Sequence, residues 1–228
     1  MERLPKLDAR LLTIASMVRE GARCADIGCD HGYLVAWLAA QKKISAGCAC
    51  DINRKPLEKA AFTLSAYRVR HRAKLLLCDG LADIRPGQVD DIVIAGMGGD
   101  LIWEILSRPD WTRDAGLRFL LQPMTKHERL RRALYANGFA ILREKAVVSR
   151  YFPYIVMQAA YTGQTRELDD ASAWVGELLA SPDPAARQYV AKVARQVREK
   201  VEGLKRSSLD SEELARYAAL LEKLEGGN

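Results

Sequence analysis

The sequence has no apolar run of the roughly 18 to 20 residues that a membrane-spanning helix needs. It also lacks an opening charged-then-apolar stretch of the kind that directs secretion. We therefore expect a cytoplasmic protein with no membrane contact. Its five cysteines all precede residue 80, and even the closest two, Cys48 and Cys50, lack the Cys-x-x-Cys spacing of a zinc site. Reduced core thiols, and no metal, are the expectation.

The dinucleotide-binding fingerprint Gly-x-Gly-x-x-Gly is also missing, although a related loop is present. Residues 24–33 read as a short apolar strand that passes through Gly28 and Gly32 and leads into an apolar helix. Asp30 stands where the fingerprint requires its second glycine, and its carboxylate would repel a pyrophosphate. The loop better suits a ligand that carries an amine or sulfonium charge, which points to S-adenosylmethionine rather than NAD.

Positive charge is concentrated in the first part of the chain. Residues 1–163 hold 25 Lys and Arg side chains against 17 Asp and Glu, whereas residues 164–228 hold 10 against 12. The overall net charge is +6. The excess on the first part favours a polyanionic partner such as a nucleic acid.

Strand and helix patterns alternate through the first 163 residues. The expected helices cover 7–20, 56–70 and 126–137, and the expected strands cover 22–28, 45–52, 74–78, 91–95, 117–122, 139–149 and 152–162. This alternation predicts an α/β fold with a doubly wound, mostly parallel sheet. The last two strands have only a short joint between them, so we expect them to be antiparallel.

The pattern changes after Gly163. Residues 168–180 read as helical, and apolar residues then recur at three-and-four spacing in two further segments separated by the polar residues 207–210. These segments predict an antiparallel, coiled-coil-like helical hairpin. Residues 187–206 are rich in basic side chains, which is compatible either with a solvated helix surface or with RNA contact.

Further candidate ligand groups follow the later strands. Asp51 lies 23 residues beyond Gly28, where a carboxylate can accept from ribose hydroxyls, although it could instead cap the next helix. Asp79, followed by Gly80, could accept from an adenine amino group. Three glycines among residues 96–99 indicate close approach of the backbone to a ligand.

Together these motifs resemble the bacterial tRNA (adenine(22)-N1)-methyltransferases over residues 7–163. The resemblance rests on residues 25–34 (ADIGCDHGYL), 79–81 (DGL), 92–99 (IVIAGMGG), 121–124 (LQPM) and 137–139 (NGF). One departure is His31-Gly32, where the family is expected to have His-Ala. The resemblance implies a Rossmann-like methyltransferase domain over residues 1–163 and a helical domain over 164–228. It also implies S-adenosylmethionine as cofactor and tRNA as partner, and we expect a monomer.

The resemblance further implies a set of cofactor-binding residues. The methionine end would be lined by Asp26, Gly28, Asp30 and His31, the ribose and adenine would be held by Asp51, Ile52, Asp79 and Gly80, and the sulfonium would be flanked by Gly96 and Met97. His31 could alternatively cap or orient the loop at the start of the helix.

Adenine N1 carries a lone pair at neutral pH, so methyl transfer to it requires alignment rather than a strong base, and we assign no catalytic residue. The sequence also lacks, after the fourth strand, the Asn/Asp-Pro-Pro-Tyr/Phe stretch of exocyclic-amine methyltransferases. N1 is on the Watson–Crick edge, so the target base must be unpaired or extruded. We expect the base to be positioned by Gly98, Gly99, Gln122 and Pro123, and the tRNA to be bound by Arg129, Arg131, Arg132, Lys192, Arg195 and Arg198.

Two alternatives remain open at this stage. A small-molecule methyltransferase would share the cofactor loops, but the basic clusters and the helical tail argue against it. A non-catalytic RNA-binding module on the same fold is disfavoured by the intact acidic positions Asp26, Asp51 and Asp79. A tRNA mobility shift would test the first alternative, and cofactor titration the second.

Overall fold

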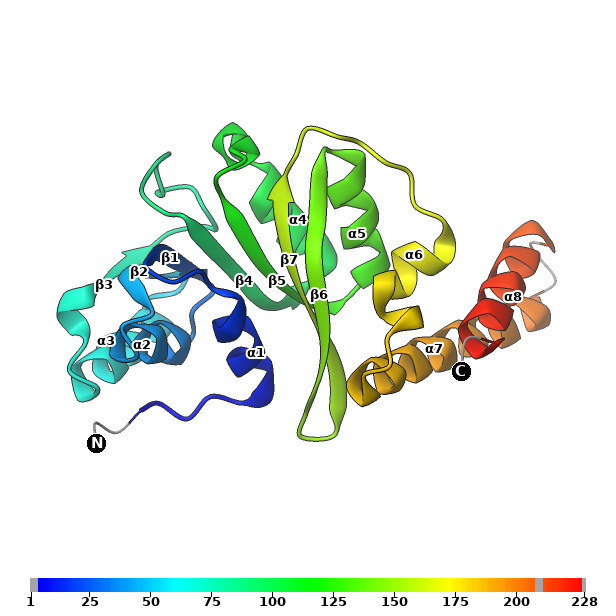
Figure 1. Cartoon of the computed structure of the whole chain (residues 1–228), viewed down its shortest axis with the longest axis horizontal. Coiled ribbons are helices and arrows are strands. Elements are labelled where there is room, and N and C mark those ends of the chain that lie inside the picture. The colour runs from blue at the N-terminus through cyan, green and yellow to red at the C-terminus, as the bar shows by residue number, and fades with distance from the viewer. Residues whose placement is uncertain (1–3, 208–210, 227–228) are drawn as a thin grey trace.

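A computed structural model of the chain describes residues 4–207 and 211–226, and its centre is a seven-stranded sheet (Figure 1). The strands are β1 (Ala22–Ile27), β2 (Ile44–Asp51), β3 (Ala73–Leu77), β4 (Asp91–Gly98), β5 (Arg118–Thr125), β6 (Phe139–Ser149) and β7 (Phe152–Tyr161). Their order is β3-β2-β1-β4-β5-β7-β6. The first five strands are parallel, and β7 is antiparallel to both β5 and β6. The predicted doubly wound, mostly parallel sheet is confirmed.

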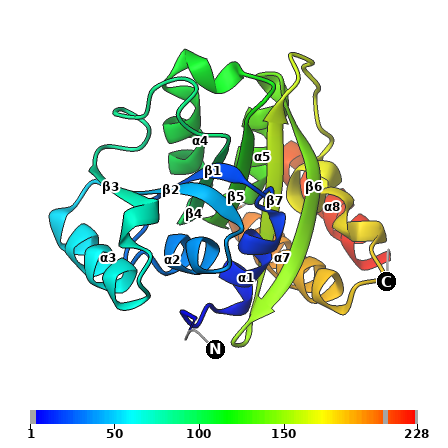
Figure 2. The ribbon, with the colours of Figure 1, turned by 60° about the vertical axis from the view of Figure 1, so that its left-hand side comes forward.

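Helices cover both faces of this sheet (Figures 1 and 2). They are α1 (Ala9–Met17), α2 (Tyr33–Ala40), α3 (Arg54–Ala66), α4 (Gly99–Ser107), α5 (His127–Ala136), α6 (Asp170–Val175), α7 (Pro184–Ser207) and α8 (Ser211–Gly226). Side chains alternate between the two faces of each strand. On β4, Val93 packs with the buried residues of α1, α2 and α3, whereas the adjacent Ile94 packs with those of α4, α5 and α7.

Several boundaries differ from the sequence-based expectation: the first helix is shorter, β4 extends three residues further to Gly98, and α4 was not predicted. The helix predicted to reach residue 70 ends at Ala66. The strand predicted to stop before Pro123 continues through it to Thr125. Proline is tolerated there because the β4–β5 pairing shifts register on either side of Met97, the residue opposite Pro123.

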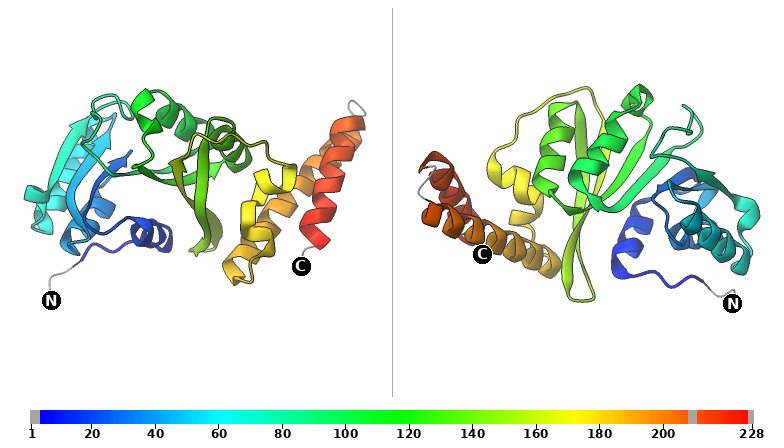
Figure 3. Two further views of the ribbon diagram at one scale, coloured as in Figure 1. Left: turned by 45° about the horizontal axis from the view of Figure 1, so that its top comes forward. Right: turned by 180° about the vertical axis from the view of Figure 1, so that it is seen from behind.

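The helical tail packs partly against the sheet. Tyr189, Val193 and Val197 of α7 are buried in the same core as Ala146 of β6 and Ile155 of β7. Helices α7 and α8 lie side by side in Figure 3, and the turn predicted between them falls largely on residues 208–210, outside the described residues. The domain boundary at residue 163 stays a prediction, since the first half of α7 contributes to the core of the sheet.

One buried ion pair joins the tail to the sheet. The guanidinium of Arg131 on α5 donates to the Glu144 carboxylate on β6, with Nη2 2.7 Å from Oε2, and Nη1 donates to the carbonyls of Ala173 and Trp174, 3.0 Å from each. The Arg131 side chain is 1% exposed. The prediction that Arg131 binds tRNA is therefore wrong, because its guanidinium is buried and donates its hydrogen bonds to groups inside the protein.

Arg131→Ala should lower the free energy of unfolding by about 3–5 kcal/mol, because it leaves the Glu144 carboxylate buried without its partner. The neighbouring Arg129→Ala is a matched control. Arg129 pairs with Asp100 at the surface, where an ion pair contributes only about 0–1 kcal/mol. Denaturant unfolding of both variants measures the difference, and equal stability of the two would contradict this role for Arg131.

Candidate functional site

The glycine loop after β1 and the glycine-rich end of β4 meet at the edge of the sheet where the parallel strands end, here called the carboxyl edge. The N–H groups of Gly28 and Cys29 both donate to the Cys50 carbonyl on β2, at 2.9 Å. Gly28 has φ +73°, and a Cβ at this position would lie 2.3 Å from Cε of Met97. Gly28 is therefore favoured for its left-handed backbone conformation, and any side chain there would displace the end of Met97.

Two carboxylates lie beneath these loops. Asp26 at the end of β1 is 6% exposed, and Asp51 at the end of β2 is 9% exposed. Burial, together with the charge of Asp51, raises the pKa of Asp26 to about 7, and the Arg10 guanidinium partly offsets this. Asp51 Oδ1 accepts from the Asn53 N–H at 2.9 Å. A cationic ligand group would stabilise the ionised form of such a carboxylate pair.

Arg10, which the sequence analysis did not select, connects α1 to this edge. Its Nη1 donates to Gln122 Oε1 at 2.6 Å, and the same oxygen accepts from the Gly96 N–H at 3.1 Å. Gln122 is fully buried. Arg10 lies far from every glycine loop in the sequence, so no spacing pattern could have indicated it.

The expected adenine-binding groups are more open. Ile52 is 63% exposed, and the Asp79 carboxylate accepts from Arg108 Nη1 at 2.8 Å. Arg108 follows the last residue of α4, so it is a second contact that the sequence did not indicate. Gly80 has φ +58°, and a Cβ there would lie 3.0 Å from the Ile105 side chain. Asp79 is thus held at the surface by an ion pair that solvent and ligands can exchange.

His31 lies on the outer side of the first loop. Its ring stacks on Tyr33 with centroids 5.5 Å apart, and its Nε2 is 3.5 Å from Asp30 Oδ2. Helix α2 begins after Gly32 without a side-chain cap, so His31 does not cap it. Its role, like that of Asp30, stays a prediction.

The surface beside these loops differs from the one expected to position a base. Gln122 and Pro123 are buried, and Gly99 is buried under the Lys126 carbonyl, from which a Cβ on Gly99 would be 2.3 Å away. These three residues support the surface from below, which corrects their prediction as base contacts. The accessible groups are Gly96 and Met124, with the half-buried Gly98 between β4 and β5.

The other predicted tRNA-binding cations differ in their availability. Arg129 is 61% exposed beside Asp100, and Arg195 is exposed on α7. Arg132 donates to Asp170, Lys192 donates to the Pro153 carbonyl, and Arg198 pairs with Glu225 on α8. Arg129 and Arg195 are therefore the most available of this set.

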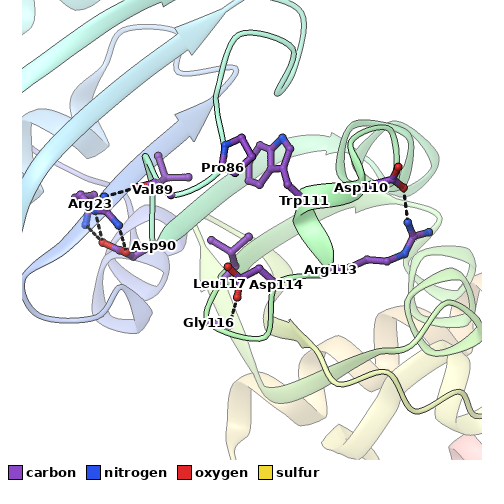
Figure 4. Close-up of a pocket in the computed structure, with 11 residues that line it drawn as sticks. Arg23, Pro86, Val89, Asp90, Asp110, Trp111, Arg113, Asp114, Gly116 and Leu117 are labelled. Atoms are coloured by element: carbon purple, nitrogen blue, oxygen red, sulfur yellow. Dashed lines mark hydrogen bonds and ion pairs between the residues drawn. The ribbon is translucent and has the colours of Figure 1, made fainter.

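Two hollows lie away from the carboxyl edge. One of about 450 Å³ lies where β1, β4 and β5 begin, and there Arg23 pairs with Asp90 and Arg113 pairs with Asp110 (Figure 4). Another, of about 890 Å³, lies over the first residues of β2 and β3. Neither is lined by any residue expected to bind the cofactor.

Within residues 4–207 and 211–226, no cluster of three or more His, Cys, Asp or Glu side chains is arranged to hold a metal ion. In the same ranges, no helix combines the length and apolarity needed to cross a membrane.

Known proteins are similar to this chain both in sequence and in fold. A profile of the methyltransferase domain matches residues 7–157. The tRNA (adenine(22)-N1)-methyltransferase of Bacillus subtilis is 32% identical over 174 residues, which cover 76% of this chain and 73% of that protein.

Solved structures give the same result over nearly the whole chain. The B. subtilis m1A22 tRNA methyltransferase TrmK is 28% identical, with a TM-score of 0.84 and coverage of 98% of this chain and 99% of that one. A Streptococcus pneumoniae protein solved in complex with S-adenosyl-L-methionine is 26% identical, with a TM-score of 0.81 and coverage of 96% and 97%. The chain therefore belongs to the tRNA (adenine(22)-N1)-methyltransferase family and is an S-adenosylmethionine-dependent methyltransferase.

Proposed function

We propose that this enzyme transfers a methyl group to N1 of adenine 22 in tRNA. The observation that carries the proposal is the open backbone of Gly96 to Gly98 beside two buried carboxylates, in a chain whose B. subtilis relative is named for this reaction. The exposed cations near this edge agree with a polyanionic substrate, which a small-molecule methyltransferase would not need.

The residues at the carboxyl edge fit S-adenosylmethionine. Asp26 is a buried carboxylate that an ammonium group would stabilise in its charged form, so we assign it to the amino group of the methionine end. Asp51 has one oxygen free of the Asn53 contact, so we assign it to the ribose hydroxyls. Gly28 keeps space next to Met97 that any side chain would fill. Gly80 and Ile52 stay predictions for the adenine.

When bound, the cofactor supplies an electrophilic methyl group on a sulfonium. The N1 lone pair forms the new bond while the electrons of the carbon–sulfur bond go to sulfur, so no proton has to be removed. The protein's contribution is alignment. Gln122 accepts from the Gly96 N–H, and Arg10 donates to Gln122, so these partly buried hydrogen bonds hold the backbone that we assign to the target base. Arg10 is therefore a positioning residue.

The reaction itself is tested with transcribed tRNA. Incubation with S-adenosylmethionine should yield one 1-methyladenosine per tRNA, detected by nucleoside mass spectrometry. Replacement of adenine 22 by guanine in the transcript should abolish the product. Methylation that persists in the replaced transcript, or no methylation of any tRNA, would overturn the proposal.

Cofactor affinity should depend on pH through Asp26. With a pKa of about 7, the ionised fraction of this carboxyl rises from roughly 0.1 at pH 6 to roughly 0.9 at pH 8. If the ionised form binds the amino group, calorimetric affinity should rise about tenfold over this range. Asp26→Asn should bind weakly and without this rise.

Asp51→Ala provides the contrast to Asp26→Asn. At pH 8 it should weaken binding by roughly ten- to a hundredfold, because the loss of a charged hydrogen-bond partner costs about 1.5–3 kcal/mol. A pH-independent affinity of the unaltered enzyme, or unchanged affinity in a folded Asp51→Ala, would refute the respective assignment.

Arg129→Ala should weaken tRNA binding and reduce the slope of log affinity against log salt by about 1, because one phosphate contact is lost. Cofactor affinity should stay unchanged. Arg113→Ala is the matched control, since Arg113 is a half-exposed, ion-paired arginine at the opposite edge of the sheet. Equal salt slopes for the two variants would show that Arg129 does not meet the RNA.

A further inference from the structure

The hairpin formed by β6 and β7 ends in two adjacent aromatic side chains that face solvent. Tyr151 is 91% exposed and Phe152 is 61% exposed. Neither ring has a hydrogen-bond or aromatic partner among the described residues. Side chains of this size are normally placed where their apolar surface can be covered, so an exposed adjacent pair indicates a contact surface.

The topology places this tip at the carboxyl edge. Because β7 runs antiparallel to β5, with Leu121 opposite Met157, the first residues of β7 lie on the side where β5 ends. The hairpin projects past the other strands between α1 and the start of α7 (Figure 1).

Arg10 connects the tip to the cofactor loops. Its guanidinium carbon lies 5.9 Å from the centre of the Tyr154 ring, while its Nη1 contacts Gln122, which holds the Gly96 N–H. Tyr151 is three residues from Tyr154, a distance of about 10 Å along an extended strand. The exposed rings are therefore on the same side of the sheet as the Gly96 backbone, and Tyr154, Arg10 and Gln122 lie between them.

The hairpin is held in place up to its turn. Ser149 pairs directly with Phe152, so only Arg150 and Tyr151 form the turn, and Arg150 adopts φ +58°. Lys192 on α7 donates to the Pro153 carbonyl at 3.1 Å, and its ammonium lies 5.7 Å from the Tyr154 ring centre. The rings are thus presented on a braced support, which lowers the entropy lost when they bind.

Methylation of adenine N1 exposes base faces on which aromatic rings could stack. Adenine N1 faces its pairing partner, so the base must leave the stack before it can receive a methyl group, and its departure exposes the faces of neighbouring bases. Aromatic side chains stack on bases irrespective of sequence. Arg150 is exposed in the same turn, and its positive charge would attract an RNA backbone.

We propose that Tyr151 and Phe152 stack on the tRNA bases uncovered when the target adenine is extruded, and so stabilise its extruded state. This inference rests on the proposed function. The rings contact RNA rather than cofactor, so they act on the availability of the adenine and not on S-adenosylmethionine binding.

The test compares Tyr151→Ala and Phe152→Ala with Phe62→Ala. Phe62 on α3 is 77% exposed and outside the carboxyl edge, so it controls for the loss of an exposed ring. We expect each hairpin variant to lower kcat/KM for tRNA by about 5- to 100-fold, as for the loss of one base-stacking ring. Phe62→Ala should be unchanged, and Tyr151→Phe, which keeps the ring, should retain activity.

Two readouts separate stacking from a structural effect. On a transcript whose target adenine is left unpaired by changing its partner base, the defect of Tyr151→Ala should shrink, because less unstacking is required. With 2-aminopurine at the target position, binding of the unaltered enzyme should increase fluorescence, and Tyr151→Ala should reduce that increase. Cofactor affinity and melting temperature should match the unaltered enzyme.

The outcomes are distinguishable. If the unaltered enzyme methylates tRNA and both hairpin variants equal it on both transcripts, the hairpin proposal alone is wrong. A defect of the same size on paired and unpaired transcripts would also overturn it. If the unaltered enzyme does not methylate tRNA, the proposed function fails and this inference fails with it.

Discussion

The buried amide of Gln122 is the interaction on which the carboxyl edge depends. Its oxygen accepts from both Arg10 and Gly96, and its nitrogen donates to the Pro123 carbonyl at 2.9 Å. One side chain on β5 therefore contacts both the N-terminal helix α1 and the glycine-rich end of β4. A buried amide with unsatisfied groups would destabilise the protein, so the three elements that satisfy it are fixed together. The bend of β4 at Met97, opposite Pro123, belongs to the same arrangement.

The charges divide into those that hold the protein together and those that remain available. Arg131 forms an ion pair with Glu144, and Arg19 forms one with Asp91. The two acidic side chains are 4% and 0% exposed. Among residues 4–207 and 211–226, no side chain forms an ion pair with the buried Asp26, and burial together with the charge of Asp51 raises its pKa. A site that keeps an unpaired buried carboxylate is prepared for a cationic ligand. The buried ion pairs of Arg131 and Arg19 stabilise the fold, whereas Arg129 pairs with Asp100 at the surface, where solvent and ligands can exchange the contact.

Short sequence motifs were sufficient to place residues that lie within a single strand-to-helix segment. The glycines of the first loop, the acidic residues at the ends of β1, β2 and β3, and the glycine-rich end of β4 all fall at the carboxyl edge, because parallel strands end together. Charge clusters on helices were less informative. Arg129 and Arg131 are two residues apart on α5, and the helical period turns one toward solvent and the other into the core.

The sequence by itself determined the fold class, the family and the positions of the glycine-rich turns, since strand alternation, glycine turns and strand-end carboxylates are encoded within short segments. The tertiary structure decided which polar groups are accessible and which distant residues meet. Only packing shows that Gln122 lies beneath the surface, that Arg10 reaches it over more than a hundred residues of chain, and that Tyr151 and Phe152 lie on the side where β5 ends. Contacts between residues so distant in sequence follow from how strands and helices pack. The helical and strand periodicities of the sequence cannot predict them.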